Sequence, residues 1–228
     1  MTKTSTKEKK TPKLQVALDF EILDDALKIA KEVAPFVDIF EVGTPLILSE
    51  GMRAIKAVKD ENPSKLLCAD LKTTDTGYLE VKLAAKAGAD IITILADAYE
   101  VTIIEALRAA HDFNVKIMAD LIVSRSPVTT LAGLIDLAYE DTKLHYALVH
   151  SGLDRQASRR APLFELEAVA RLREHPGLAI AGGIRVTDIV NIMEFPVDII
   201  IVGGGITRAK DPPKAAEDIR KAINQYSK

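Results

Sequence analysis

The chain has 228 residues, 48% of them hydrophobic, and its 30 lysines and arginines against 33 aspartates and glutamates give a formal net charge of -3. This balance excludes a strongly basic nucleic-acid-binding surface, and no apolar run reaches the roughly 18 residues that a transmembrane helix needs. The single cysteine, Cys68, excludes an internal disulfide and favours the reducing cytoplasm as the location.

The start of the sequence, MTKTSTKEKKTPK, is polar and charged, and no apolar segment of the signal-peptide kind follows it. We expect residues 1–13 to form a flexible N-terminal tail. No linker, low-complexity segment or shift in composition divides the rest of the chain. Residues 14–228 are therefore predicted to form one catalytic domain.

Eight short runs of apolar and β-branched residues recur along this domain and predict β-strands. They span residues 14–19, 38–43, 65–72, 90–96, 115–122, 146–152, 178–184 and 198–204. Segments with apolar residues at helical spacing separate the strands and close the chain, and these predict amphipathic helices. They span residues 23–34, 50–60, 78–88, 101–113, 127–140, 164–175, 186–195 and 212–226.

The alternation of strands and helices predicts the fold class. Near-continuous apolar strands are typical of parallel sheets, because the crossover helices cover both faces of the sheet. Eight such units in a chain of this length predict a single closed (β/α)8 barrel, an α/β fold, rather than a doubly wound open sheet. In a (β/α)8 barrel the functional groups lie where the strands end and the following loops begin.

The predicted strand ends carry many polar residues. They are Asp19, Glu41, Asp70, Lys72, Asp120, His150 and Ser151. Asp70 and Lys72 are two positions apart on one strand, so both side chains are expected to point into the mouth of the barrel. Such a pair can be a structural ion pair at a strand end. Because four other strands bring ionisable groups to the same rim, we interpret the pair as part of a functional site.

The last two predicted strands end in glycines instead, at Gly182, Gly183, Gly203 and Gly204. A glycine after a strand can be a simple turn residue. Two neighbouring strands that both end in this way favour a phosphate site, because the loops after strands seven and eight of such barrels frequently bind phosphate through backbone N–H groups. A phosphorylated small molecule is the predicted ligand.

Glu41 and Asp70 are carboxylates on adjacent predicted strands. Mg2+ is usually held by one or two carboxylates, with water and substrate oxygens completing its shell. A metal together with Lys72 would stabilise the negative charge of an enolate or enediolate oxygen. His150 would then move protons near neutral pH.

These residues resemble a known group of enzymes. The motif D-x-K-x-x-D, present from Asp70 to Asp75, and the strand VALD that ends in Asp19 resemble the orotidine 5'-monophosphate decarboxylase suprafamily. Within it, the segments LQVALD, EVGTPLI, ADLKTTDTG, VHSGLDRQA and IVGGGITRAKDP are most similar to the 3-hexulose-6-phosphate synthases, in the same order along the chain. Orotidine 5'-monophosphate decarboxylases usually carry lysine where this chain has Glu41. The 3-keto-L-gulonate 6-phosphate decarboxylases carry arginine and glutamate where it has Leu153 and Asp120.

The resemblance implies a Mg2+-dependent aldolase, an aldehyde-lyase that joins formaldehyde to D-ribulose 5-phosphate through an enediolate, or cleaves the product. Carried onto matching positions, it implies that Glu41 and Asp70 bind the metal. It implies that Lys72 stabilises the enediolate and that His150 transfers protons.

The same resemblance assigns three further aspartates. Asp19 and Asp120 would contact substrate hydroxyls or orient neighbouring side chains. Asp75, the second aspartate of the motif, would reach the active site of a partner subunit, which implies a homodimer. No nucleic acid or membrane is expected among the partners.

Three arginines, Arg125, Arg159 and Arg160, depart from the family pattern and leave the phosphosugar substrate open. A 3-keto-L-gulonate 6-phosphate decarboxylase, or another phosphosugar enzyme of the suprafamily, is the alternative. A non-catalytic phosphosugar-binding barrel is an alternative of another class. The lysine and paired acids around a metal site argue against it, because a binding protein needs no such set.

Overall fold

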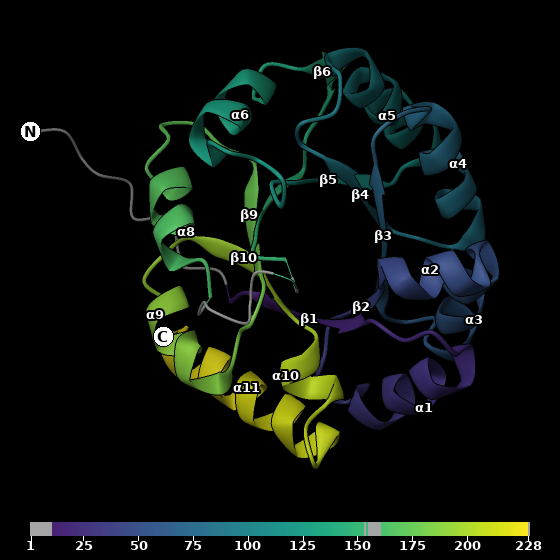
Figure 1. Ribbon diagram of the computed structural model, residues 1–228, viewed down its shortest axis with the longest axis vertical. Helices are drawn as coiled ribbons and strands as arrows, with labels where there is room; N and C mark the ends of the chain where they lie inside the picture. Colours follow the sequence, from purple (N-terminus) through teal and green to yellow (C-terminus); the bar gives the residue numbers. More distant parts are fainter. Residues whose placement is uncertain (1–10, 153, 155–160, 228) are drawn as a thin grey trace, which may run out of the picture.

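The computed structural model describes residues 11–152, 154 and 161–227 of the chain. Eight parallel strands close into a barrel in the order β1, β10, β9, β8, β5, β4, β3, β2, and helices form a ring around it (Figure 1). The predicted (β/α)8 barrel is confirmed. Among the described residues, no helix has the length and apolar character to cross a membrane.

All eight predicted strands are present with ends close to those expected. They are β1 (Lys13–Leu18), β2 (Ile39–Val42), β3 (Leu66–Thr73), β4 (Ile91–Leu95), β5 (Lys116–Asp120), β8 (Tyr146–His150), β9 (Gly177–Ala181) and β10 (Val197–Val202). β1 begins at the last residue of the predicted tail, and residues 1–10 of that tail lie outside the described residues.

The helices lie where they were predicted, but several differ from the prediction in length. They are α1 (Leu23–Val33), α2 (Thr44–Glu50), α3 (Met52–Glu61), α4 (Gly77–Ala87), α5 (Glu100–Phe113), α6 (Pro127–Leu134), α8 (Leu163–Ala170), α9 (Ile189–Ile192), α10 (Gly204–Thr207) and α11 (Pro212–Tyr226), with a 3-10 turn, η1 (Val186–Asp188), before α9. The predicted helices over 164–175 and 186–195 are shorter than expected, and α2 and α10 were not predicted.

The predicted helix over residues 127–140 is wrong in its second half. It ends at Leu134, and β6 (Ala138–Tyr139) and β7 (Thr142–Lys143) form an antiparallel hairpin. Glu140, in the turn, lies in the left-handed region at φ 52. The Tyr139 ring packs edge-on against the His111 ring of α5, with 5.8 Å between centroids. This packing on α5 replaces the continued helix.

Two layers of apolar side chains hold the barrel together, because alternate residues of each strand point inward and outward. The outer layer lies between strands and helices and includes Phe40, Ile92 and Ile103. The inner layer fills the barrel with Ala17, Ile39, Cys68, Ile91, Met118, Leu148, Ala179, Ala181, Ile199 and Ile201. The polar residues of the strand ends lie beyond this packed interior, at the C-terminal end of the strands, which we call the mouth.

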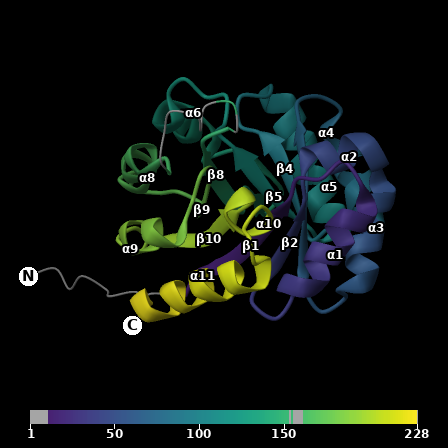
Figure 2. The ribbon, with the colours of Figure 1, turned by 60° about the horizontal axis from the view of Figure 1, so that its bottom comes forward.

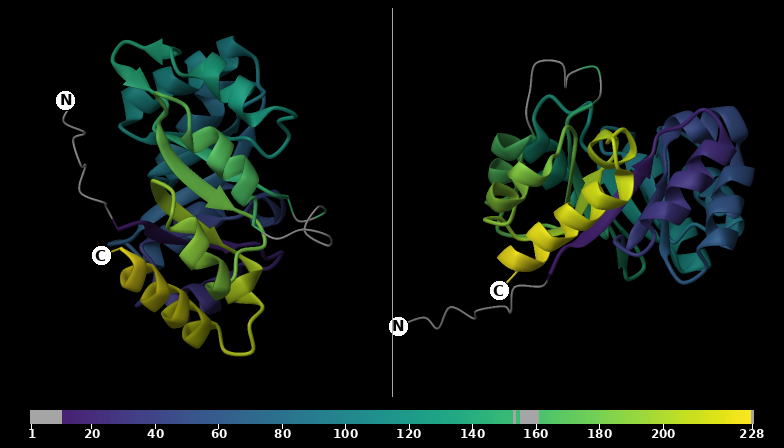
Figure 3. Two further views of the ribbon diagram at one scale, coloured as in Figure 1. Left: turned by 90° about the vertical axis from the view of Figure 1, so that its left-hand side faces the viewer. Right: turned by 90° about the horizontal axis from the view of Figure 1, so that it is seen from below.

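The C-terminal helix closes the ring of helices. α11 packs against α1 along the outside of the barrel (Figure 2). The Nε atom of Arg220 donates to the Phe36 carbonyl at 3.0 Å, and its guanidinium pairs with Asp38. The start of β1 therefore lies near the end of α11, as both views of Figure 3 show.

The N-terminal end of the strands, which we call the base, carries a repeated hydrogen bond. A backbone N–H of every second barrel strand donates to a side chain at, or just before, the start of the next strand of the barrel. The pairs are Leu14 with Asp38 Oδ2 (2.8 Å), Leu67 with Asp90 Oδ2 (2.8 Å), Ile117 with His145 Nδ1 (3.2 Å) and Leu178 with Asp198 Oδ2 (2.9 Å). These bonds satisfy donors that the sheet leaves unpaired.

Candidate active site

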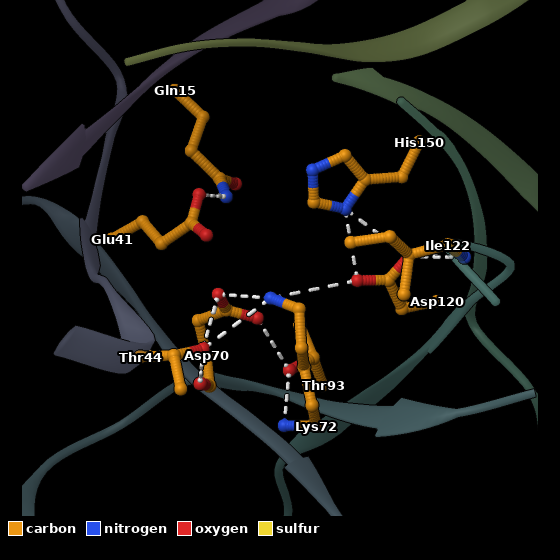
Figure 4. Close-up of polar contacts among 9 residues, drawn as sticks. All are labelled: Gln15, Glu41, Thr44, Asp70, Lys72, Thr93, Asp120, Ile122 and His150. Carbon is orange, nitrogen blue, oxygen red and sulfur yellow. Dashed lines mark hydrogen bonds and ion pairs between the residues drawn. The ribbon is translucent and has the colours of Figure 1, made fainter. Parts of the chain in front are cut away.

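A cavity of about 1030 Å³ opens at the mouth of the barrel. It brings together most of the predicted site residues, from both ends of the sequence. Those that line it are Asp19, Glu41, Asp70, Lys72, His150, Gly182, Gly183, Gly203 and Gly204. The convergence inferred from the strand ends is thus present in the structure (Figure 4).

Asp70 and Lys72 form the centre of this group, as their spacing predicted. Lys72 Nζ contacts Asp70 Oδ2 and lies 3.6 Å from Asp120 Oδ2. Burial opposes the charge on Lys72, but the charges of Asp70 and Asp120 outweigh it and raise the pKa of Lys72. The lysine therefore presents a stable cation to the cavity.

Asp70 is held by several donors at once. The Thr93 hydroxyl donates to Asp70 Oδ1 at 2.8 Å, and the Thr44 hydroxyl lies 2.9 Å from Asp70 Oδ2. Burial alone would raise the pKa of Asp70, but the charge of Lys72 and these hydrogen bonds together lower it. Asp70 is thus a fixed carboxylate that stays ionised.

Glu41 lies on the neighbouring strand in a different electrostatic environment. Gln15 Nε2 donates to Glu41 Oε2 at 2.6 Å. Burial and the nearby charges of Asp70 and Asp19 raise the pKa of Glu41 well above its usual range. Burial raises the pKa of Asp19 as well, with a further contribution from Asp70. The carboxyl groups of Glu41, Asp70 and Asp19 thus lie close enough for their negative charges to repel one another, and a bound cation would relieve this repulsion.

The donor chemistry fits a hard divalent cation. Glu41 and Asp70 are only 6% and 5% exposed, and both line the cavity from adjacent strands. Beside Glu41, the buried Gln15 Oε1 has no hydrogen-bond partner within the described part of the chain. Among the residues that the structure describes, no group of three or more histidines, cysteines or acids converges as a metal site. Two carboxylates would leave the remaining positions to water and ligand oxygens, as is usual for Mg2+.

His150 is oriented by Asp120. Its Nδ1 atom lies 3.0 and 3.2 Å from the two carboxylate oxygens of Asp120. Asp120 is fully buried, does not line the cavity, and also accepts the Ile122 N–H at 3.0 Å. Of the two roles expected for Asp120, the geometry favours orienting a neighbour over contacting a ligand. The second ring nitrogen of His150, Nε2, faces the middle of the mouth (Figure 4).

The glycine loops form the opposite side of the cavity. Gly182 and Gly183 have φ values of 107 and 66, and a Cβ atom at Gly182 would lie 2.3 Å from the Ser151 carbonyl oxygen. A Cβ atom at Gly204 would lie 2.2 Å from Arg208 Nη2. The glycines therefore allow the backbone and the Arg208 guanidinium to approach the same space, which suits an anion.

Two cavity residues, Arg185 and Arg208, were missed by sequence reasoning. Each follows a glycine loop by two or three positions, and this basic residue after the glycines was the available signal. Together with backbone N–H groups, two arginines would hold a phosphate more firmly than the glycine loops alone.

The remaining predicted residues lie away from the cavity or outside the described residues. Asp75 is exposed on the loop before α4, and its carboxylate accepts the Thr76 N–H at 2.7 Å. Arg125 is exposed after β5 and does not line the cavity. Leu153, Arg159 and Arg160 lie outside the described residues.

Comparison with protein-family models identifies the family. The model described as Orotidine 5'-phosphate decarboxylase / HUMPS family matches residues 12–219. The chain belongs to this family. The resemblance of its motifs is thereby confirmed.

Individual relatives agree with the family match along nearly the whole chain. The 3-hexulose-6-phosphate synthase of Mycobacterium gastri is 38% identical over 213 residues, which cover 92% of this chain and 99% of the relative. The crystal structure of 3-hexulose-6-phosphate synthase from Salmonella typhimurium superimposes with a TM-score of 0.88 at 35% identity, covering 94% of this chain and 99% of that one. The 3-keto-L-gulonate-6-phosphate decarboxylase from Vibrio cholerae superimposes with a TM-score of 0.77 at 28% identity, covering 95% and 99%.

Proposed function

We propose that this family member is a Mg2+-dependent 3-hexulose-6-phosphate synthase that joins formaldehyde to D-ribulose 5-phosphate, or runs the reverse cleavage. The observation that carries the proposal is a lysine, Lys72, held between two acids in a cavity whose opposite side, which we call the anion-binding wall, is formed by the glycine loops, Arg185 and Arg208. The similarity to synthases over nearly the whole chain supports the same activity.

The substrate phosphate would bind at the glycine loops, near Arg185 and Arg208. Its sugar carbons would then extend across the cavity toward β3, where Lys72 and Asp70 lie. This placement brings carbons 1 and 2 of the sugar near the cation of Lys72 and near His150 Nε2. A fixed phosphate converts the reaction into one between prepositioned groups.

The chemistry needs one proton removed and one returned. His150 Nε2 takes a proton from carbon 1 of ribulose 5-phosphate, and the electron pair moves to the oxygen on carbon 2, which gives an enediolate. Lys72 stabilises this oxygen by its charge. The carbonyl at carbon 2 then re-forms as carbon 1 attacks the formaldehyde carbon, and the former carbonyl oxygen of formaldehyde receives the proton held by His150 Nε2. The product is a hexulose phosphate with its ketone at carbon 3.

Glu41 and Asp70 would hold Mg2+. The ion supplies Lewis-acid stabilisation of negative charge on substrate oxygens when it is bound. The raised pKa of Glu41 fits this assignment, because a divalent cation favours the ionised form of a carboxylate that burial and neighbouring acids disfavour. Gln15 orients Glu41 through the hydrogen bond to Oε2.

One assay tests the proposal directly. Purified protein is incubated with Mg2+, D-ribulose 5-phosphate and 13C-formaldehyde, and the reaction is followed by NMR with and without excess EDTA. We expect a new labelled hexulose phosphate signal that disappears with the chelator. Product formation that is unaffected by EDTA would exclude the metal, and absence of product would exclude the synthase.

A second candidate is decarboxylation of 3-keto-L-gulonate 6-phosphate, favoured by the structural likeness to the Vibrio cholerae decarboxylase. That reaction also passes through an enediolate and would use Lys72 and the anion-binding wall in the same way. The decarboxylase pattern differs from this chain at Asp120 and Leu153, so we rank it second. If neither substrate turns over, a phosphosugar-binding barrel becomes the better interpretation.

We also propose that the chain forms a homodimer in which Asp75 serves the partner's cavity. Asp75 is exposed and lies outside its own cavity. Asp75 precedes α4, and α2 and α5 lie on either side of α4 (Figure 1). Large apolar side chains are exposed on these two neighbours, where Leu48 of α2 is 82% and Tyr99, just before α5, is 83% exposed. A second copy that covered them would bring its own Asp75 close.

Mixing two inactive variants tests this arrangement. Lys72→Ala and Asp75→Asn chains are each expected to be inactive. In a mixed dimer with shared sites, one site has both changes and the other has neither, so random pairing restores about a quarter of the wild-type rate. If Asp75 acts in its own chain, the mixture stays inactive.

A further inference from the structure

The pairing of β3 with β4 is irregular at the centre of the site. Ala69 pairs with Ile92, and the next pair joins Thr73 to Ile94. The three residues Asp70, Leu71 and Lys72 therefore lie opposite Thr93 alone. This β-bulge adds two residues to β3, so the alternation of inward and outward side chains is kept on both sides of it.

The bulge imposes an unfavourable backbone conformation on the proposed catalytic lysine. Lys72 has a φ of 50, in the left-handed region that residues with a side chain rarely adopt. Such a conformation persists only where the surroundings hold it in place. Some contact of the bulge must therefore fix the Lys72 backbone.

Thr93 makes this contact. Its hydroxyl oxygen accepts the backbone N–H of Lys72 at 3.0 Å, and its hydroxyl proton is donated to Asp70 Oδ1 at 2.8 Å. The side chain is 1% exposed and points inward from β4 between these two partners (Figure 4). A single hydroxyl therefore joins both ends of the bulge and uses its donor and acceptor capacity at once.

Thr44 does not duplicate this role. Its hydroxyl donates to the Asp70 carbonyl at 2.8 Å and lies 2.9 Å from Asp70 Oδ2 and 3.3 Å from Lys72 Nζ, so it contacts the first residue of the bulge and the end of the lysine side chain, but not the Lys72 backbone. Thr93 instead contacts the backbone of Lys72. It determines where the lysine side chain begins, whereas Thr44 contacts it only where it ends.

We propose that Thr93 is a positioning residue, which places the Lys72 ammonium group and the Asp70 carboxylate relative to each other for the reaction. The effect on turnover rests on the proposed function, because it concerns the group that stabilises the enediolate. The effect on the Lys72 backbone does not rest on it, and the two can be measured separately.

The kinetic test compares three substitutions. Thr93→Val removes the hydroxyl at nearly constant volume, and Thr93→Ser retains it. Thr73→Val is the matched control, because Thr73 is equally buried at the end of the bulge and its hydroxyl has no partner among the described residues. We expect Thr93→Val to lower kcat by about 10–100-fold, the usual effect of losing a partner that orients a site residue.

The expected pattern differs from that of general destabilisation. KM for ribulose 5-phosphate should change by less than about twofold in Thr93→Val, because the phosphate binds on the opposite side of the cavity. Thr93→Ser and Thr73→Val should keep kcat within about threefold of wild type. A Thr93→Val enzyme with wild-type kcat, or an equal loss in Thr73→Val, would overturn the proposal.

Amide hydrogen exchange at Lys72, followed by NMR, gives a readout that needs no activity. The Lys72 N–H should be protected in wild type and in Thr93→Ser, and should exchange at least about tenfold faster in Thr93→Val. Unchanged exchange in Thr93→Val contradicts the proposed contact. If the wild-type protein shows no synthase activity but the Lys72 N–H still exchanges faster in Thr93→Val than in wild type, the proposed function is rejected and the positioning role is retained.

Discussion

The two ends of the barrel use the same residue types for different purposes. At the base, Asp38, Asp90 and Asp198 each accept a backbone N–H from a neighbouring strand, and the first two also pair with Arg220 and Lys59. These carboxylates are separate from one another, and each has its own partners. Their role is to close the sheet.

At the mouth, three carboxylates share one cavity. Burial, with the repulsion of neighbouring acids, raises the pKa values of Glu41 and Asp19, whereas the charge of Lys72 helps to keep the pKa of Asp70 low. The comparison shows that an aspartate at a strand end stabilises the fold when its partners are complete. Where several acids instead share one cavity and one neighbouring cation, their charges are available to act on a ligand. Changes at the mouth should therefore affect rate, and changes at the base should affect stability.

The largest expected effect is that of Lys72→Ala at the mouth. Removing the cation that we propose to stabilise the enediolate should lower kcat by about 100–1000-fold, in line with the loss of one preorganised group at a transition-state anion. Calorimetry should show that ribulose 5-phosphate still binds, because the substitution leaves the proposed phosphate site intact. Lys59→Ala at the base is the matched control and should keep the wild-type rate. A Lys72→Ala enzyme with near-wild-type kcat would refute the role of this lysine.

Asp90→Ala at the base should have an intermediate effect, on stability alone. The change leaves the Leu67 N–H without its acceptor and Lys59 without its ion pair. We expect the free energy of unfolding, measured in urea, to fall by about 1–3 kcal/mol. The kcat of the folded protein should stay within error of wild type. A loss of rate with unchanged stability would show that the two ends are not separate.

The smallest effect concerns His145, the one histidine in the repeated hydrogen bond at the base. Its Nδ1 atom accepts the Ile117 N–H and must be unprotonated to do so. Burial, with the charge of Lys116, lowers the pKa of His145 below its usual 6.5. Between the two pKa values the unfolded chain binds more protons, so stability should fall as the pH drops below about 6.5.

The comparison with His145→Asn isolates this dependence, because an asparagine oxygen can accept the same N–H without titrating. The difference in free energy of unfolding between wild type and His145→Asn should change with pH by less than about 1.4 kcal/mol per pH unit, the limit for one proton. Glu41 and Asp19 contribute a pH dependence of stability with the opposite sign. This contribution is present in both proteins, so it cancels when their stabilities are subtracted. Parallel stability curves from pH 7 to pH 5 would argue against a titrating His145.

Much of the fold and part of the site followed from the sequence for physical reasons. The strands are apolar on both faces because helices cover them, and this made all eight visible. The strand ends then placed Asp19, Glu41, Asp70, Lys72 and His150 around one opening. Such predictions need only the direction of the strands and the alternation of side chains.

Other features cannot be recognised from the spacing of apolar residues along the sequence. The bulge in β3 adds two residues, so the alternation continues as if the strand were regular, and Thr93 resembles any β-branched strand residue. The helical spacing of apolar residues runs past Leu134 into the β6–β7 hairpin, which made that helix too long. Arg208 was overlooked although it closely follows the glycines, because only the fold shows that this position lines the cavity.

The single thiol of the chain provides an internal reporter. Cys68 is fully buried in the inner layer and pairs in register with Glu41, directly below the site. Burial and the charges of Glu41 and Asp70 raise the pKa of the thiol well above its usual range, so it is unreactive while the barrel is closed. Its rate of modification by a thiol reagent therefore measures how often β2 and β3 separate. Slower modification when a phosphosugar is added would show that a ligand bound at the mouth makes the separation of β2 and β3 less frequent.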